Sequence, residues 1–194
     1  MYPEQLYSVL VVSAPGKSAA AISALLPESD YEPVRYAGSA AAARQELSVR
    51  SYDLVLINGP LPDETGARLA ADLCAEKGTV PLLLVPADLF AEIGTRMQTQ
   101  GVFTLSKPTS SMMLSQALRW MAAARERLRR TEKKTATIEE KMEEIRLVNR
   151  AKWLLIEQLK MTESDAHRYI EKQAMDTRLS RREVAENIIR TYDM

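Results

Sequence analysis

The stretch APGKS, residues 14–18, comes nearest to a pattern that binds nucleotides. A phosphate-binding loop ends in the same three residues, and its backbone N–H groups and lysine surround the phosphates. Such a loop also begins with a glycine five residues before Gly16, and Val11 stands there instead. Without that glycine the backbone cannot form the full phosphate cradle. We therefore expect a loop and the start of a helix here, not a nucleotide site.

Cysteine and histidine serve many enzymes as nucleophiles, bases and metal ligands, and this chain has one of each, Cys74 and His167. A single cysteine has no partner for an internal disulfide, and the two residues supply too few ligands for a zinc cluster. No set of nucleophile, base and metal ligands can be assembled from the other residues. We therefore expect a protein that is not an enzyme and that holds no metal or other cofactor.

Composition and the first residues predict a cytoplasmic protein. The hydrophobic and charged fractions, 46% and 27%, are ordinary for a folded, water-soluble chain. The opening residues MYPEQLYSVLVVS contain no basic segment and no apolar run of about 20 residues, so we expect neither a signal peptide nor a membrane span.

The net charge is zero, but the two parts of the chain differ in sign. Residues 1–124 carry 9 lysines and arginines against 12 acidic residues, and residues 125–194 carry 17 against 14. So small a positive excess is weak evidence for a polyanionic partner by itself, because charged helices are usually just solvated.

The first 108 residues alternate apolar runs with amphipathic stretches, which predicts alternating strands and helices. The runs at 54–57 and 82–85 are apolar on both sides, as parallel strands require when helices cover both faces of their sheet. A further short strand at 32–36 brings the expected number to five. We therefore predict an α/β doubly wound, flavodoxin-like domain with a five-stranded parallel sheet.

From Thr109 onward the sequence contains no glycine or proline and is rich in Glu, Lys, Arg, Ala and Leu, which predicts helices only. Alternating steps of three and four residues trace an apolar seam over about five heptads. Its members are Leu114, Ala117, Met121, Ala124, Leu128, Thr131, Thr135, Ile138, Met142, Ile145 and Asn149. So narrow a stripe cannot be buried without a partner, and we prefer a parallel coiled-coil homodimer to a single surface helix. We assign dimerisation to Leu128, Ile138, Met142, Ile145 and Asn149.

Two helix-start signals divide the end of the chain into three helices. Thr162 with Asp165 resembles an N-cap, and Ser180 with Glu183 forms a capping box. The inward stripes expected for the three helices are Ala151, Leu155 and Leu159; Ala166, Ile170 and Ala174; and Val184, Ala185, Ile188 and Ile189. We therefore predict a domain at 1–123, a coiled-coil helix at 124–148 and a three-helix bundle at 149–194.

The first 120 or so residues resemble the receiver domain of response regulators. The resemblance is carried by DLVLINGPLPDETG at 53–66 and by Ser-Lys-Pro at 106–108. Receivers place an acidic pair after the first strand for Mg²⁺, a phosphate-accepting aspartate after the third, a hydroxyl after the fourth and a lysine after the fifth. The matching positions here are Ser13 and Ala14, Asn58, Pro86 and Lys107.

Of these functional positions only the lysine keeps its residue type. Phosphoryl transfer needs a carboxylate nucleophile and enough negative charge to bind Mg²⁺, and an amide supplies neither. The resemblance therefore implies a degenerate receiver that neither accepts phosphate nor binds Mg²⁺ tightly, with Lys107 held near Asn58 by the inherited geometry.

Residues from about 146 to 192 resemble an ANTAR domain, the RNA-binding module of bacterial antitermination regulators. The matching segments are Ala151-Lys152, TExxA at 162–166, AMD at 174–176 and RREVAExII at 181–189. The order receiver, coiled coil and ANTAR is also that of the family. Trp153 and His167 depart from the residues common at their positions, which leaves local packing and contacts open. The resemblance implies a homodimer that binds paired stem-loops in leader messenger RNA and prevents an overlapping terminator hairpin from forming.

RNA loops are recognised by exposed cationic and planar groups, because their bases are unstacked and their phosphates crowded. The candidates on the three helices are Arg150, Lys152, Arg168, Lys172, Arg178, Arg181 and Arg182. Lys152 is the strongest, since the family motif and the charge argument coincide there. The alternative for this set is ion pairing with nearby glutamates. We expect the basic run at 125–134 to be a solvated surface, and Trp153 and Tyr169 to be buried.

Two other functions stay open. The helices joined at 178–180 superficially suggest a DNA-binding helix-turn-helix factor, although the last helix has acidic residues interleaved. A non-enzymatic dimeric adaptor, sequestered by a regulatory protein, is the other alternative. Control by a protein partner, by a small ligand at the carboxyl edge of the receiver sheet or by concentration alone is equally compatible with the sequence.

Overall fold

The computed structural model describes residues 6–76 and 78–192. The chain divides into two compact units, the first ending at Arg130 and the second beginning at Thr131. The helix α5, Ser111–Leu159, contributes residues to both units. Each unit has hydrophobic clusters of its own.

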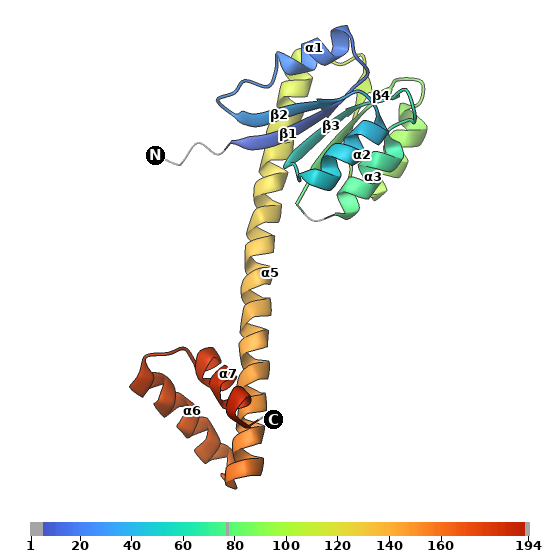
Figure 1. The fold of residues 1–194 in the computed structure, drawn as a ribbon. Helices are drawn as coiled ribbons and strands as arrows, with labels where there is room; N and C mark the ends of the chain where they lie inside the picture. Colours follow the sequence, from blue (N-terminus) through green and yellow to red (C-terminus); the bar gives the residue numbers. More distant parts are fainter. Residues whose placement is uncertain (1–5, 77, 193–194) are drawn as a thin grey trace. The chain divides into compact units, whose positions relative to one another are not determined.

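A five-stranded parallel sheet with the order β2-β1-β3-β4-β5 forms the centre of the first unit (Figure 1). Its strands are β1 Tyr7–Val12, β2 Tyr31–Ala37, β3 Leu54–Asn58, β4 Val80–Pro86 and β5 Phe103–Lys107. Every residue of β3 is buried, because helices cover both faces of the sheet. The predicted doubly wound, flavodoxin-like fold is therefore confirmed.

Alternate residues of the strands pack in two hydrophobic clusters, one on each face of the sheet. Leu10, Val55 and Leu83 pack with α2, Ala40–Val49, and α3, Ala67–Ala75, which Figure 1 draws on the same face. The strand residues between them pack with α1, Lys17–Ser23, and with the beginning of α5. Between β4 and β5 the chain forms a π-helical turn, Phe90–Gly94, followed by the short α4, Thr95–Thr99.

The first part of the predicted coiled-coil seam packs in the core of the first unit instead. Leu114, Ala117 and Met121 are buried in the cluster against β1, β3 and β4, and Ala124 packs partly against it. The prediction that the seam begins at Leu114 is therefore wrong, because these side chains already have a partner within their own unit. Farther along α5 the seam is solvent-exposed, as the side chains of Ile138, Met142 and Ile145 are 57%, 51% and 59% exposed. Within the described part of the chain, no helix is both long and apolar enough to cross a membrane.

The second unit packs the end of α5 against α6, Glu163–Thr177, and α7, Arg181–Tyr192. Both predicted helix starts are confirmed. Thr162 Oγ1 accepts the backbone N–H of Asp165 at 3.2 Å, and Ser180 and Glu183 exchange reciprocal hydrogen bonds. The core consists of Ala151, Leu155, Ala166, Ile170, Val184, Ala185 and Ile188. Leu159 was expected inside and is 43% exposed, because α5 ends there and the chain turns toward α6.

Candidate functional site

The carboxyl edge of the sheet brings together three of the receiver positions, at the ends of β1, β3 and β5. Asn58 is buried, and its amide Nδ2 donates to Ser13 Oγ at 3.0 Å. Lys107 Nζ donates to Asn58 Oδ1 at 2.9 Å, and Ser13 Oγ donates to the carbonyl of Ala14 at 3.1 Å. Partial burial lowers the pKa of Lys107 below its usual value. The lysine is held next to Asn58, as the sequence predicted.

This arrangement lacks the groups that phosphoryl transfer uses. Neither Ser13, Ala14, Asn58 nor Pro86 carries a carboxylate, and Pro86 stands beside Lys107 in the β4–β5 pairing where a hydroxyl would be needed. Among the described residues, no group of three or more histidines, cysteines or carboxylates is placed to hold a metal ion. The printed contacts of the Asn58 side chain are therefore with a neutral hydroxyl, that of Ser13, and with one cation, Lys107.

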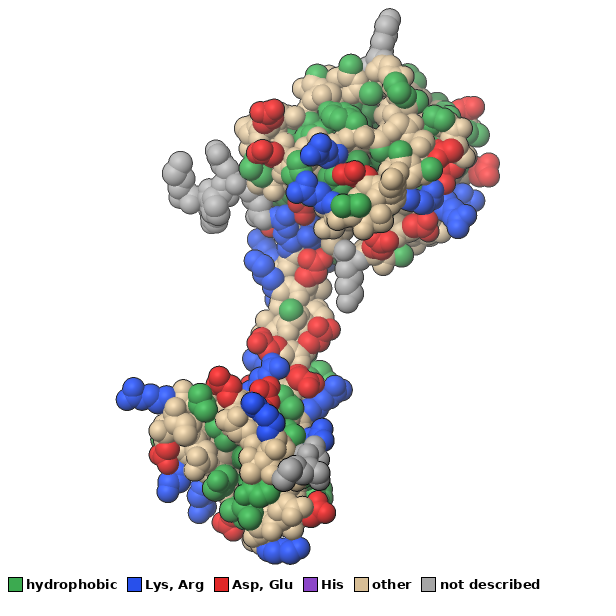
Figure 2. Space-filling view, in the orientation of Figure 1, with side chains coloured by type: hydrophobic (Ala, Val, Ile, Leu, Met, Phe, Trp, Pro, Cys, Tyr) green, Lys and Arg blue, Asp and Glu red, His purple; other side chains and the backbone are tan. Residues whose placement is uncertain are grey.

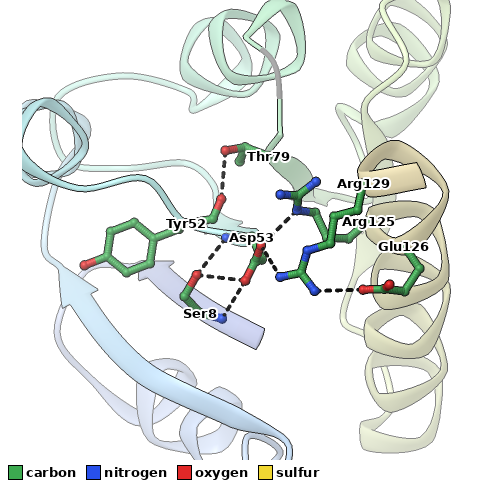
Figure 3. Close-up of polar contacts among 7 residues, drawn as sticks. All are labelled: Ser8, Tyr52, Asp53, Thr79, Arg125, Glu126 and Arg129. Carbon is green, nitrogen blue, oxygen red and sulfur yellow. Dashed lines mark hydrogen bonds and ion pairs between the residues drawn. The ribbon is translucent and has the colours of Figure 1, made fainter. Parts of the chain in front are cut away.

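At the amino edge of the same sheet, a carboxylate that the sequence analysis did not single out is clamped by α5 (Figure 3). Asp53 directly precedes β3, and its Oδ1 accepts hydrogen bonds from Arg125 Nε and Arg129 Nη2, both at 2.8 Å. Its Oδ2 accepts from the backbone N–H and the hydroxyl of Ser8, both at 3.0 Å. Arg129 also pairs with Glu126 at 2.9 Å.

Two arginines of the basic run are therefore not solvated, contrary to the prediction. The side chains of Arg125 and Arg129 are only 12% and 21% exposed, and that of Asp53 is 14% exposed. Burial alone raises the pKa of Asp53, but the hydrogen bonds from Arg125 and Ser8 and the charge of Arg129 outweigh burial, so the pKa lies below its usual value. Two arginines four residues apart were a signal of a shared helix face, but only the fold places Asp53 beneath them.

Three of the seven predicted RNA-binding residues are engaged in ion pairs. Lys152 Nζ lies 3.1 Å from Glu163 Oε1, and only 16% of its side chain is exposed. The guanidinium of Arg181 lies 3.2 Å from Glu144 on α5. The guanidinium of Arg182 lies 3.0 Å from Glu186, and this hydrogen bond raises the pKa of Arg182. For these three residues the ion-pair alternative is the one that the structure shows.

Three others, Arg168 and Lys172 on α6 and Arg178 just after it, are exposed and form no ion pair with any described residue. Arg178 adopts a left-handed conformation with φ 57° and ends α6. The remaining candidate, Arg150, is exposed and has a polar interaction of its own. Figure 2 shows basic side chains spread over the second unit, with acidic ones between them.

Two aromatic residues of the second unit lie on its surface rather than inside. Trp153 is 71% exposed and Tyr169 is 36% exposed, so the expected burial of both rings is wrong. The reason is helical phase. Ala151 and Leu155 lie on the same face of α5 and pack into the core of the bundle. Trp153, halfway between them in the sequence, therefore projects from the opposite face toward solvent.

Comparison with known proteins gives both units relatives. A model of the ANTAR domain matches residues 136–189. The transcriptional regulatory protein PdtaR of Mycobacterium tuberculosis, in strains CDC 1551 / Oshkosh and H37Rv, is 30% identical over 171 residues, which are 88% of this chain and 83% of that protein.

Solved structures of receiver domains are similar in fold. A CheY-like receiver domain from Methylobacillus flagellatus is 26% identical with a TM-score of 0.51, covering 60% of this chain and 99% of that one. The chemotaxis response regulator CheY4 of Vibrio cholerae is 21% identical with a TM-score of 0.52, again over 60% of this chain and 99% of its own. The likeness to these structures concerns the fold.

Proposed function

The chain belongs to the ANTAR response regulators, a family that regulates transcription and is not enzymatic, and we propose that it is an RNA-binding antiterminator. As a homodimer it stabilises paired stem-loops in a leader messenger RNA, so that an overlapping terminator hairpin cannot form. This proposal rests on the ANTAR match over 136–189. Within this match, α6 and its end present exposed cations that form no ion pair with a described acidic residue.

Arg168, Lys172 and Arg178 are the residues we place against the RNA backbone. Each is exposed without an ion pair among the described residues, so a phosphate can bind without first breaking an internal contact. Lys152 would first have to leave Glu163, 3.1 Å away. We therefore rank Lys152 below these three in direct phosphate contact, and assign it to holding α5 against the start of α6.

Dimerisation is supported by the exposed part of the seam. Leu128, Ile138, Met142 and Ile145 repeat at heptad spacing and are between 40% and 59% exposed, which is unusual for large apolar side chains. Asn149 is exposed at the next seam position, where pairing with its copy in a second chain would fix the register. A parallel coiled coil buries all five.

Independence from aspartyl phosphorylation is part of the proposal and is supported by the residues at the carboxyl edge of the sheet. Asn58 offers an amide at the acceptor position, and Ser13 and Ala14 offer no negative charge for Mg²⁺. The regulator therefore changes state through binding or dimerisation rather than through an acyl phosphate.

The test is binding of the full chain to a two-hairpin leader RNA over a range of salt concentrations. The double variant Arg168→Gln, Lys172→Gln should bind at least about tenfold more weakly, and its log–log salt slope should shrink by about 1.4, because two phosphate contacts are lost. The matched control is Arg68→Gln, Arg96→Gln, which removes two exposed charges from the first unit and should bind normally.

Three results would contradict the proposal. Equal affinity for duplex DNA would favour the DNA-binding factor, and a stable dimer that binds no hairpin RNA would favour the adaptor. A double variant no weaker than its control would show that α6 does not face the RNA.

A further inference from the structure

A cavity of about 270 Å³ opens beside Lys107 at the carboxyl edge of the receiver sheet. It lies between α1, the ends of β3, β4 and β5, and the segment that begins α5. Its volume is near the lower end of the roughly 300–1,000 Å³ typical of small-molecule sites. A small metabolite therefore fits it, and a peptide or nucleic acid does not.

The cavity is lined by both apolar and polar residues. The apolar ones include Ile22, Leu25, Leu84 and Leu114, and three of these four are buried core residues. The lining residues that carry hydroxyl groups are Ser18, Thr109, Ser110 and Ser111. Among the described residues that line the cavity there is no aspartate or glutamate.

Lys107 is the one charged residue among the described residues that line this cavity. Within the described chain its ammonium has one hydrogen bond, to the neutral Oδ1 of Asn58, and no ion pair. A partly buried cation is costly unless an opposite charge accompanies it. In a phosphorylatable receiver that charge comes from carboxylates at the matching positions, whereas Ser13, Ala14 and Asn58 carry none.

We propose that this cavity binds a small organic anion with an apolar body, whose carboxylate or phosphate group pairs with Lys107 and whose body contacts Leu25 and Leu114. Thr109 and Ser111 also line the cavity and carry hydroxyl groups that can donate to the remaining anion oxygens. The bound anion also contacts the loop and first turn of α5, since four consecutive lining residues, 108–111, belong to it.

The experiment titrates the ¹⁵N-labelled full chain with four six-carbon probes: hexanoate, hexyl phosphate, 1-hexanol and hexylammonium. Backbone amide shifts should saturate with the two anions around Asn58 and 108–114, should be weaker with the alcohol, and should be absent with the ammonium ion. The relative affinity of hexanoate and hexyl phosphate then distinguishes a carboxylic acid from a phosphate ester as the ligand.

Two variants and a control locate the site. Lys107→Gln should raise the hexanoate Kd by about tenfold or more, because a charge-assisted hydrogen bond is lost. Ala21→Phe narrows the cavity from the exposed side of α1 and leaves Lys107 in place, so it should abolish binding in a chain that melts at the normal temperature. Arg68→Gln removes a distant exposed charge from the same unit and should leave the Kd unchanged.

Equal binding of hexanoate and 1-hexanol, equal effects of Lys107→Gln and Arg68→Gln, or no saturable shift with either anion at millimolar concentrations would overturn the proposal. Because these titrations contain no RNA, their failure leaves the antiterminator proposal standing. Failure of RNA binding likewise leaves the cavity unaffected.

Discussion

The two ends of β3 pair their buried polar side chains in different ways. At the amino end the carboxylate of Asp53 is held by two guanidinium groups and two groups of Ser8. At the carboxyl end, where a receiver would place its acceptor aspartate, Asn58 shares neutral hydrogen bonds with Ser13 and a cation, Lys107. The largely buried negative charge just before β3 therefore holds α5, whereas the acceptor position at the other end of the strand carries no charge.

Charged hydrogen bonds at one end of β3 and hydrogen bonds with an amide at the other both pair the polar side chains there. The polar side chains at both ends of β3 are satisfied, and within the described residues no buried side-chain nitrogen or oxygen lacks a hydrogen bond. We expect the charged end to contribute more to the stability of the first unit than the neutral end.

The largest expected effect is at the amino end. Asp53→Asn should lower the free energy of unfolding of the first unit by about 3 kcal/mol, because Arg125 and Arg129 lose their shared counter-ion while largely buried. Urea titration of a Trp153→Phe background measures this, since Trp120 then reports on the first unit alone. Asp88→Asn, at an exposed position in the same unit, is the control. A loss equal to that of the control would mean that the clamp contributes nothing.

The same carboxylate should make the first unit sensitive to acid. The pKa of Asp53 is lower in the folded chain than its ordinary value, so the unfolded chain binds the proton more readily. The stabilisation is complete above the ordinary carboxyl pKa of about 3.9 and is lost as the pH falls through that value toward the folded pKa. Urea titrations from pH 7 to pH 3 should show the gap between wild type and Asp53→Asn closing. A gap that stays constant would contradict the lowered pKa.

Two serine variants compare the ends directly. Ser8→Ala removes two side-chain hydrogen bonds at the charged end, and we expect a loss of about 2 kcal/mol. Ser13→Ala removes the partner of the neutral Asn58 amide, and we expect about 1 kcal/mol. Denaturant midpoints measured side by side decide the order. The reverse order would show that the charged clamp is not the stronger of the two.

The smallest effect is expected from restoring the carboxylate at the other end. Asn58→Asp places an acid beside Lys107, and the new ion pair should offset its own desolvation, leaving stability within about 1 kcal/mol. Mass spectrometry after incubation with acetyl phosphate and Mg²⁺ should find no stoichiometric adduct on wild type or variant. We expect no adduct on the variant because Ser13 and Ala14 still supply no carboxylate to bind Mg²⁺. An adduct on either protein would contradict this reading of the edge.

The periodicity of the sequence predicted the individual helices and strands, but it could not predict the contacts between two of them. The five strands, the long helix and both caps followed from apolar spacing and capping residues near each other in the sequence. The heptad pattern could not tell that Leu114 to Met121 face a sheet, whereas Ile138 to Ile145 face solvent, because both stretches have the same spacing. Asp53 and Arg125 are 72 positions apart in the sequence, and the residues around neither of them indicate that the two side chains are in contact.

The amide at Asn58 also affects how long the regulator can stay active after a stimulus ends. An acyl phosphate keeps a regulator active until the bond is hydrolysed, so a phosphorylated receiver retains a record of a past stimulus. An amide forms no such bond, and a state that depends only on bound molecules relaxes as fast as they dissociate. On the proposed function, this protein would follow the present level of its effector and keep no memory of an earlier one.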